Sequence, residues 1–139
     1  MSDIFLGGAC GNSSWRDRLI PALQEHNITY FNPVVTDWNE EAMEIEEREK
    51  ENSKFRLYVL SPRTYGYYSI AEAVDDSNKC PEKVIFYIME EDGATEYSES
   101  LLKHLNKVKD IVGSNGGYVA EDFPDIVDYV LENTQPLIA

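Results

Sequence analysis

A glutamate follows a tyrosine-rich loop in this sequence, and its surroundings suggest two different roles. Glu72 comes after an apolar run at residues 55–60 and a loop that contains Tyr65, Tyr67 and Tyr68. A carboxylate among aromatic side chains can serve as a nucleophile or a general base. The pattern Ser69-x-x-Glu72 also fits a capping box, in which Glu72 would bond the Ser69 N–H at the start of a helix. The residues alone leave both interpretations open.

Residues 7–16 form a second candidate binding loop. They read Gly-Gly-Ala-Cys-Gly-Asn-Ser-Ser-Trp-Arg and precede a helical pattern. Glycines allow a backbone to approach a ligand closely, and a helix N-terminus attracts an anion. Arg16, in the first turn of that helix, would add a charge-assisted contact. The loop matches no dinucleotide or P-loop fingerprint, so a tight turn that binds nothing is the alternative.

Metal and thiol chemistry have little support in the sequence. His26 and His104 lie far apart, and neither has a second His or Cys at ligand spacing. We therefore expect no metal site and no cofactor. Cys10 has no evident histidine partner, so we interpret it as a small loop residue and not as a nucleophile.

Apolar runs alternate with helical patterns along the whole chain, as in repeated βα units. The predicted strands are residues 4–6, 28–31, 55–60, 84–89 and 118–120, and the predicted helices are residues 14–26, 36–52, 69–78, 97–112 and 122–133. The helix at 36–52 is very acidic and is expected to be a solvated outer helix. Residues 90–99 are expected to be an acidic loop.

This alternation predicts a single α/β domain over residues 1–139. The expected fold is a flavodoxin-like three-layer sandwich with a five-stranded parallel sheet in the order 2-1-3-4-5. Ligands bind such sheets beyond the carboxyl ends of the strands, where the strand order switches. The two candidate loops would meet at that point.

The chain has 139 residues, of which 26 are acidic and 12 basic, for a net charge of −14. Such a surface repels phosphate backbones, so we expect no nucleic-acid polymer as a partner. Two cysteines make no disulfide framework, and neither an apolar run of membrane-spanning length nor a signal-peptide pattern is present. We therefore expect a cytoplasmic protein without membrane association.

Several segments together resemble the nucleoside 2-deoxyribosyltransferase-like family. They are residues 5–8, 12–16, 31–35, 37–38 and 69–73, and the likeness extends over about residues 3 to 90. The resemblance implies the flavodoxin-like fold. It also implies that Glu72 attacks the anomeric carbon, that Gly7 and Gly8 lie against the sugar, and that Asp37 and Trp38 contact the base.

The chain departs from the pattern of active transferases at two positions. Ser61, at the end of the third strand, and Gly66, before the nucleophile, stand where such enzymes usually carry aspartates. Arg63 and Tyr65 are candidates to replace some of the lost contacts. The substrate-binding residues that we expect are Gly7, Gly8, Asn12, Ser13, Arg16, Asp37, Trp38, Ser61 and Tyr65.

Two classes of function follow. The first is transfer or hydrolysis of the N-glycosidic bond of a (deoxy)nucleoside or its 5′-monophosphate, with Glu72 as nucleophile. If Arg16, at a helix N-terminus beside Ser13 and Ser14, holds a 5′-phosphate, monophosphates bind more tightly than nucleosides. The second is a non-catalytic nucleotide-binding or regulatory module on the same fold. The apolar residues 136–139 and the tyrosine loop also predict a homodimer or larger homo-oligomer.

Overall fold

Five parallel strands form the sheet on which the chain is built. The computed structural model describes residues 2–11, 13–34 and 39–134. The strands are β1 (Ile4–Gly8), β2 (Tyr30–Phe31), β3 (Phe55–Leu60), β4 (Val84–Ile88) and β7 (Tyr118–Val119). They lie in the order β2-β1-β3-β4-β7, and each neighbouring pair is parallel. The order is the predicted 2-1-3-4-5 when these five strands are counted in sequence, so the flavodoxin-like α/β fold is confirmed.

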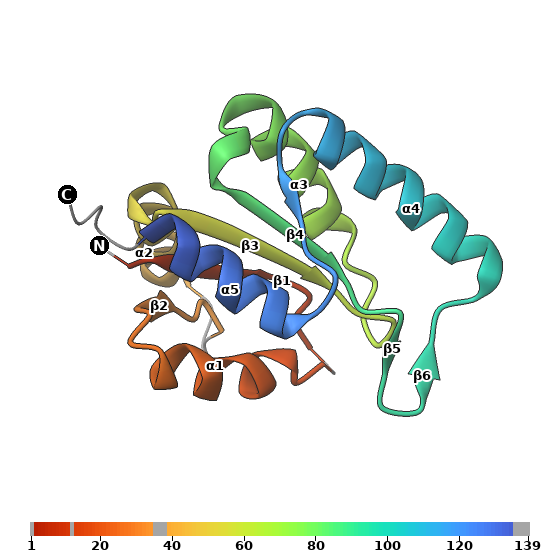
Figure 1. The fold of residues 1–139 in the computed structure, drawn as a ribbon, viewed down its shortest axis with the longest axis horizontal. Helices are drawn as coiled ribbons and strands as arrows, with labels where there is room; N and C mark the ends of the chain where they lie inside the picture. Colours follow the sequence, from red (N-terminus) through yellow and green to blue (C-terminus); the bar gives the residue numbers. More distant parts are fainter. Residues whose placement is uncertain (1, 12, 35–38, 135–139) are drawn as a thin grey trace.

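Two pairs of helices cover the two faces of the sheet (Figure 1). On one face, α1 (Trp15–Glu25) and α5 (Phe123–Thr134) share a core with Phe55, Leu57 and Val59 of β3. On the other face, α3 (Tyr67–Lys79) and α4 (Glu99–Ser114) share a core with Tyr58 and Leu60. Successive side chains of a strand point to opposite faces, and all six residues of β3 are buried. This is why β3 is an unbroken apolar run with Arg56 as its only charge.

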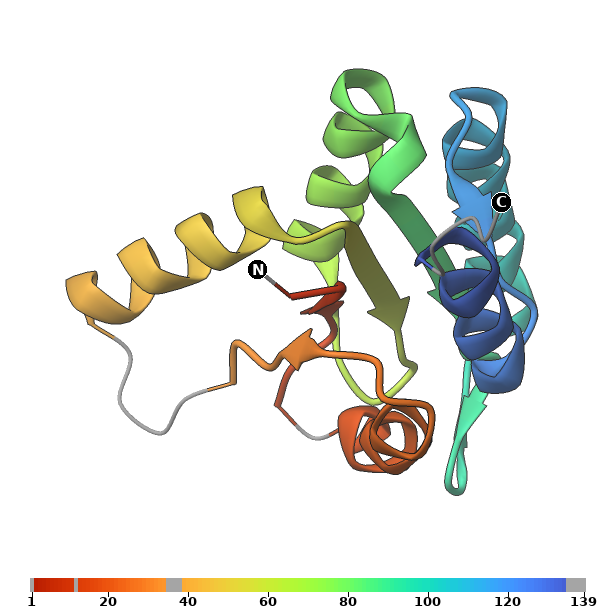
Figure 2. The same ribbon diagram turned by 60° about the vertical axis from the view of Figure 1, so that its left-hand side comes forward.

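The acidic helix α2 (Glu40–Asn52) stands apart from these layers. It begins after Asn39, whose side-chain oxygen accepts a hydrogen bond from the Ala42 N–H at 2.8 Å. The predicted start at Thr36 is therefore wrong, because an N-cap asparagine fixes the first turn later in the chain. None of the side chains of α2 is buried, and Figure 2 shows the helix extending away from the sheet. The prediction of a solvated outer helix is confirmed.

Residues 90–99 are not the irregular loop that the sequence predicts. They contain an antiparallel hairpin of β5 (Glu91–Asp92) and β6 (Thr95–Glu96), joined by a two-residue turn. Gly93 in this turn has φ of +63°, a left-handed conformation that glycine adopts without strain. The acidic composition hid the hairpin, because charged residues are rare in strands.

None of the helices in the described part of the chain has the length and apolarity that a membrane crossing requires.

Candidate active site

One large open cavity lies beyond the carboxyl ends of β1 and β3, where the strand order switches. Its volume is about 1370 Å³. The loops after β1, β2 and β3 contribute to its wall, together with side chains from α2, α3 and α4. Five of the predicted site residues line it, namely Gly7, Gly8, Arg16, Tyr65 and Glu72. Asn12, Asp37 and Trp38 fall outside the described residues.

Glu72 faces this cavity from the second turn of α3. The helix begins at Tyr67 and has Gly66 as its N-cap, with φ of +63°, so Ser69 lies inside the first turn. The capping box is therefore wrong, because its serine would have to precede the helix. The carboxylate of Glu72 instead accepts a hydrogen bond from the Lys50 ammonium, with 2.8 Å between Nζ and Oε2. With its side chain 19% exposed, Glu72 is accessible from the cavity.

A second carboxylate, Glu46, enters the same cavity from α2. Burial raises the pKa of Glu46, and the negative charge of Glu72 raises it further. Glu46 and Lys50 are four residues apart, so they share one face of α2. Sequence reasoning missed both residues. The i, i+4 spacing was visible, but nothing local to α2 shows that this face meets α3.

A buried ionic cluster lies behind Glu72. Asp76, one turn further along α3, accepts a hydrogen bond from the Tyr58 hydroxyl and pairs with Arg56, with 3.1 Å between Nη1 and Oδ1. Burial alone would raise the pKa of Asp76, but the Tyr58 hydrogen bond and the charges of Lys50 and Arg56 hold it below its ordinary value. The buried environment of Asp76 therefore favours its charged form next to the Lys50–Glu72 pair.

Comparison with known families decides the affiliation of the chain. A model of the family described as nucleoside 2-deoxyribosyltransferase like matches residues 1–91. The chain belongs to this family. A comparison with curated proteins gave no match.

For a nucleoside 2-deoxyribosyltransferase-like protein, nucleosides are the expected small-molecule substrates and glycosyl transfer is the expected type of reaction. The matched segment contains β1 to β4, and with them Glu46, Lys50 and Glu72. The β5–β6 hairpin and α4 supply the rest of the cavity wall, through Glu96, Tyr97 and Leu105 among others.

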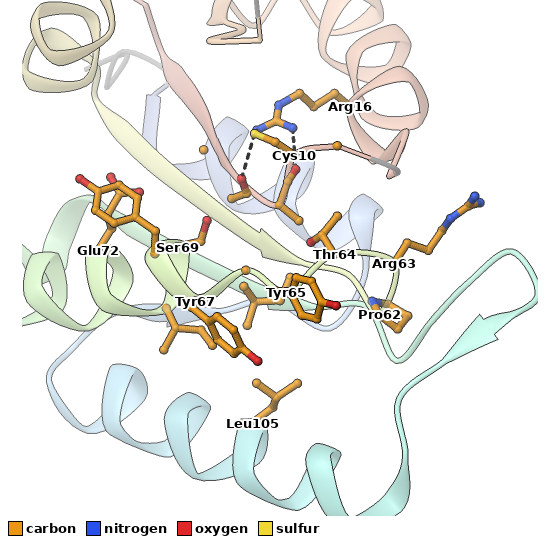
Figure 3. Close-up of a pocket in the computed structure, with 18 of the residues that line it drawn as sticks. Cys10, Arg16, Pro62, Arg63, Thr64, Tyr65, Tyr67, Ser69, Glu72 and Leu105 are labelled. Carbon is orange, nitrogen blue, oxygen red and sulfur yellow. Dashed lines mark hydrogen bonds between the residues drawn. The ribbon is translucent and has the colours of Figure 1, made fainter. Parts of the chain in front are cut away.

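Arg16 of this transferase-like chain is buried and already engaged. Its Nε and Nη2 donate to the Leu6 carbonyl at 3.1 and 2.9 Å, and its Nη1 donates to the Ala9 carbonyl at 2.7 Å. The guanidinium thus braces the end of β1, and Arg16 is also one of the residues that line the cavity (Figure 3). Phosphate binding by Arg16 stays a prediction.

Two serines of the predicted site, Ser13 and Ser61, do not line the cavity and instead share Asp92 as a hydrogen-bond acceptor. Asp92 of β5 accepts hydrogen bonds from the Ser13 hydroxyl at 2.7 Å and from the Ser61 hydroxyl at 2.6 Å. Neither serine is among the described residues that line the cavity. Burial alone would raise the pKa of Asp92, but these two hydrogen bonds hold it below its ordinary value. Asp92 therefore joins the hairpin to the loops after β1 and β3.

The loop after β3 and the first turn of α3 form an aromatic ridge in the cavity wall. Tyr65 and Tyr67 stack with ring centroids 5.8 Å apart and are 84% and 74% exposed. Figure 3 shows these tyrosines between Arg16 on one side and Leu105 of α4 on the other. Beside them, the Thr64 hydroxyl is a buried polar atom that has no hydrogen-bond partner within the described residues. A flat ring and a polar ligand atom would each find a complement here.

Proposed function

We propose that this cavity cleaves the N-glycosidic bond of a nucleoside or a nucleoside 5′-monophosphate, with Glu72 as nucleophile. The observation that supports this is the position of Glu72: its carboxyl group lines an open cavity, accepts a hydrogen bond from Lys50 and has no capping role, and Glu46 lines the same cavity. Lys50 engages Oε2, and no described residue donates to Oε1. Oε1 is therefore the oxygen available for attack.

In the first half-reaction, Oε1 of Glu72 forms a bond to the anomeric carbon of the sugar. The bond from that carbon to the base nitrogen breaks, and its electron pair leaves with the base. Glu46 donates its proton to the departing base, a role suited to a carboxyl group whose pKa is raised. The products are free base, a glycosyl ester of Glu72 and an ionised Glu46.

In the second half-reaction, an acceptor attacks the anomeric carbon and the ester bond to Glu72 breaks. The acceptor's proton returns to Glu46, and the Glu72 carboxylate is regenerated. A second base as acceptor makes the protein a transferase, whereas water makes it a hydrolase. The cavity, about 1370 Å³ in volume, leaves room for either acceptor.

The decisive measurement is base release from deoxynucleosides, ribonucleosides and their monophosphates, followed by liquid chromatography. We expect Glu72→Gln to retain the fold and to lower base release by roughly 10³-fold or more, because an amide oxygen is a poor nucleophile. The matched control is Asp75→Asn on the exposed face of the same helix, which should keep full activity. A Glu72→Gln protein that turns over at the wild-type rate would contradict the nucleophile.

The competing function is a non-catalytic nucleotide-binding module. The ion pair between Glu72 and Lys50 supports it, because a paired carboxylate can have a purely structural role. Binding of nucleosides or monophosphates without base release, equal in wild type and in Glu72→Gln, would favour this module over the enzyme.

A further inference from the structure

We propose that Lys50 is a positioning residue for the nucleophile: its ammonium fixes Glu72 in the resting protein and is retained by Asp76 when Glu72 becomes an ester. This inference rests on the proposed function. It assigns to the outer helix α2 a part in the chemistry of α3.

The geometry places the Lys50 ammonium between two carboxylates. Nζ lies 2.8 Å from Oε2 of Glu72 and 3.4 Å from Oδ2 of Asp76, and it also lies 5.6 Å from the centroid of the Tyr58 ring. The side chain of Lys50 is only 20% exposed. The ammonium is thus shielded from bulk water, where an exposed pair would contribute little.

The position of Lys50 does not depend on its ammonium alone. Its carbonyl accepts a hydrogen bond from Arg56 Nε at 3.3 Å, and the next residue, Glu51, pairs with Arg56 Nη2 at 3.3 Å. The Glu51 carbonyl accepts a further hydrogen bond from Lys83 at 3.2 Å. These contacts anchor the last turn of α2 to β3, although the helix buries no side chain. The lysine is therefore held in place before any ligand arrives.

The second carboxylate, Asp76, keeps the Lys50 ammonium paired while Glu72 is an ester. Esterification converts the Glu72 carboxylate to a neutral group, and an ammonium left alone in a shielded site is costly. Asp76 keeps its negative charge through its bonds to Tyr58 and Arg56. A shift of the ammonium toward Asp76 keeps the charge of Lys50 paired, and Lys50 neither gives up nor takes a proton.

The test compares Lys50→Met, which keeps the length of the side chain, with Lys50→Arg, which keeps its charge. We expect Lys50→Met to lower kcat by about tenfold to a hundredfold with KM within about twofold of wild type, because the nucleophile is misplaced while the substrate contacts remain. Lys50→Arg should recover most of that loss. Lys79→Met, at the exposed end of α3, removes an ion pair with Asp75 outside the cavity; it is the matched control and should match wild type.

The pH dependence of kcat gives a second test, because a lysine with a purely structural role would not change it. The charge of Lys50 lowers the pKa of Glu46, so its removal should raise that pKa. Glu46 acts in its protonated form, so the alkaline limb of the kcat profile should move to higher pH in Lys50→Met and stay in place in Lys79→Met. The other charged or titratable groups around Glu46 and Lys50 are Glu47 on α2, Arg16 on α1, Glu72 and Asp76 on α3, and Tyr58 and Arg56 on β3.

The outcomes separate this inference from the proposed function. An active wild type with a Lys50→Met protein of equal kcat and pH profile overturns the role of Lys50 and leaves the enzyme intact. A wild type that releases no base from any nucleoside overturns both. If Lys50→Met fails to fold, Lys50→Gln, which keeps a hydrogen-bond donor without the charge, replaces it under the same criteria.

Discussion

The buried hydroxyl of Thr64 has no hydrogen-bond partner among the described residues, and a bound ligand could supply one. A buried hydroxyl without a partner loses its hydrogen bonds to water and receives none in return, which destabilises the fold by about 1–3 kcal/mol. Such an arrangement is tolerated where a bound molecule completes the bond. The position of Thr64 in the cavity wall, next to the tyrosine ridge, makes a substrate the natural partner.

Thr64→Val tests this directly, because valine has nearly the same shape and no hydroxyl. We expect the free energy of unfolding to stay equal or to rise, and the affinity for the best nucleoside ligand to fall by about fivefold to tenfold. Thermal unfolding and calorimetric titration measure the two effects. A loss of stability with unchanged affinity would show that the hydroxyl serves the fold and not the ligand.

Gly8 shows that packing alone can require a glycine in a cavity wall. Its φ is +104°, and a Cβ at this position would lie 2.3 Å from the backbone nitrogen of Val59. The glycine is therefore required by the close approach of β1 to β3. Gly11, in the same loop, also has a positive φ of +85°, but a Cβ added to it would meet no atom within 4 Å. The sequence predicted both as binding-loop glycines and could not separate packing from recognition.

At the level of elements, the β5–β6 hairpin is held to the sheet through Asp92. Its carboxylate accepts hydrogen bonds from two hydroxyls on two different loops, so a short hairpin of charged residues gains a fixed position. Hydrogen bonds to an ionised acceptor stabilise by about 1.5–3 kcal/mol each.

Asp92→Asn keeps the shape of the side chain and removes its charge. The pKa of Asp92 is depressed in the folded protein, so its contribution is present above the unfolded value of about 3.9 and is lost as pH falls through the folded value. We expect Asp92→Asn to be less stable by about 1–2 kcal/mol at pH 7, with the difference shrinking toward pH 3. Urea unfolding at both pH values measures it. Asp110→Asn on the exposed side of α4 is the control. A loss of stability in Asp92→Asn that is the same at pH 7 and pH 3 would contradict a role for the charge of Asp92.

The sheet could be predicted from the sequence because each central strand is a distinct apolar run between turn residues. β3 was predicted with its observed ends, Phe55 and Leu60. The start of α3 was not, because Gly66 in a left-handed conformation caps a helix without the side-chain pattern that signals a cap. Pairings between elements, such as Glu72 with Lys50 or Ser61 with Asp92, depend on how helices and loops approach in space. No local pattern carries that information.

At the scale of the whole molecule, most of the large exposed hydrophobic side chains of the described residues line the cavity, Met43 and Ile111 being the exceptions. Tyr65, Tyr67 and Tyr68 are each more than 70% exposed, and Val34 and Leu101 nearby are about half exposed. Aromatic residues are enriched in protein interfaces, so this rim is a suitable contact surface for a second copy of the chain.

We expect a homodimer or larger closed oligomer with the tyrosine loop near the contact. Light scattering after size-exclusion chromatography should give a multiple of 15.9 kDa, and Tyr67→Ala should lower that mass or weaken assembly and ligand binding together. A mass of one chain at working concentration would refute the oligomer. The tail at residues 136–139, which the sequence also predicted to pack on a partner, lies outside the described residues.

The way α2 is attached gives this molecule two levels of stability. Because its contacts with the sheet are concentrated in the last turn, the helix can fray from its amino end while the core remains folded. Its early amides should therefore exchange with solvent far faster than those of β3. A ligand that engages Glu72 tightens the Lys50 end and slows that exchange, so amide protection at the amino end of α2 reports whether the cavity is occupied.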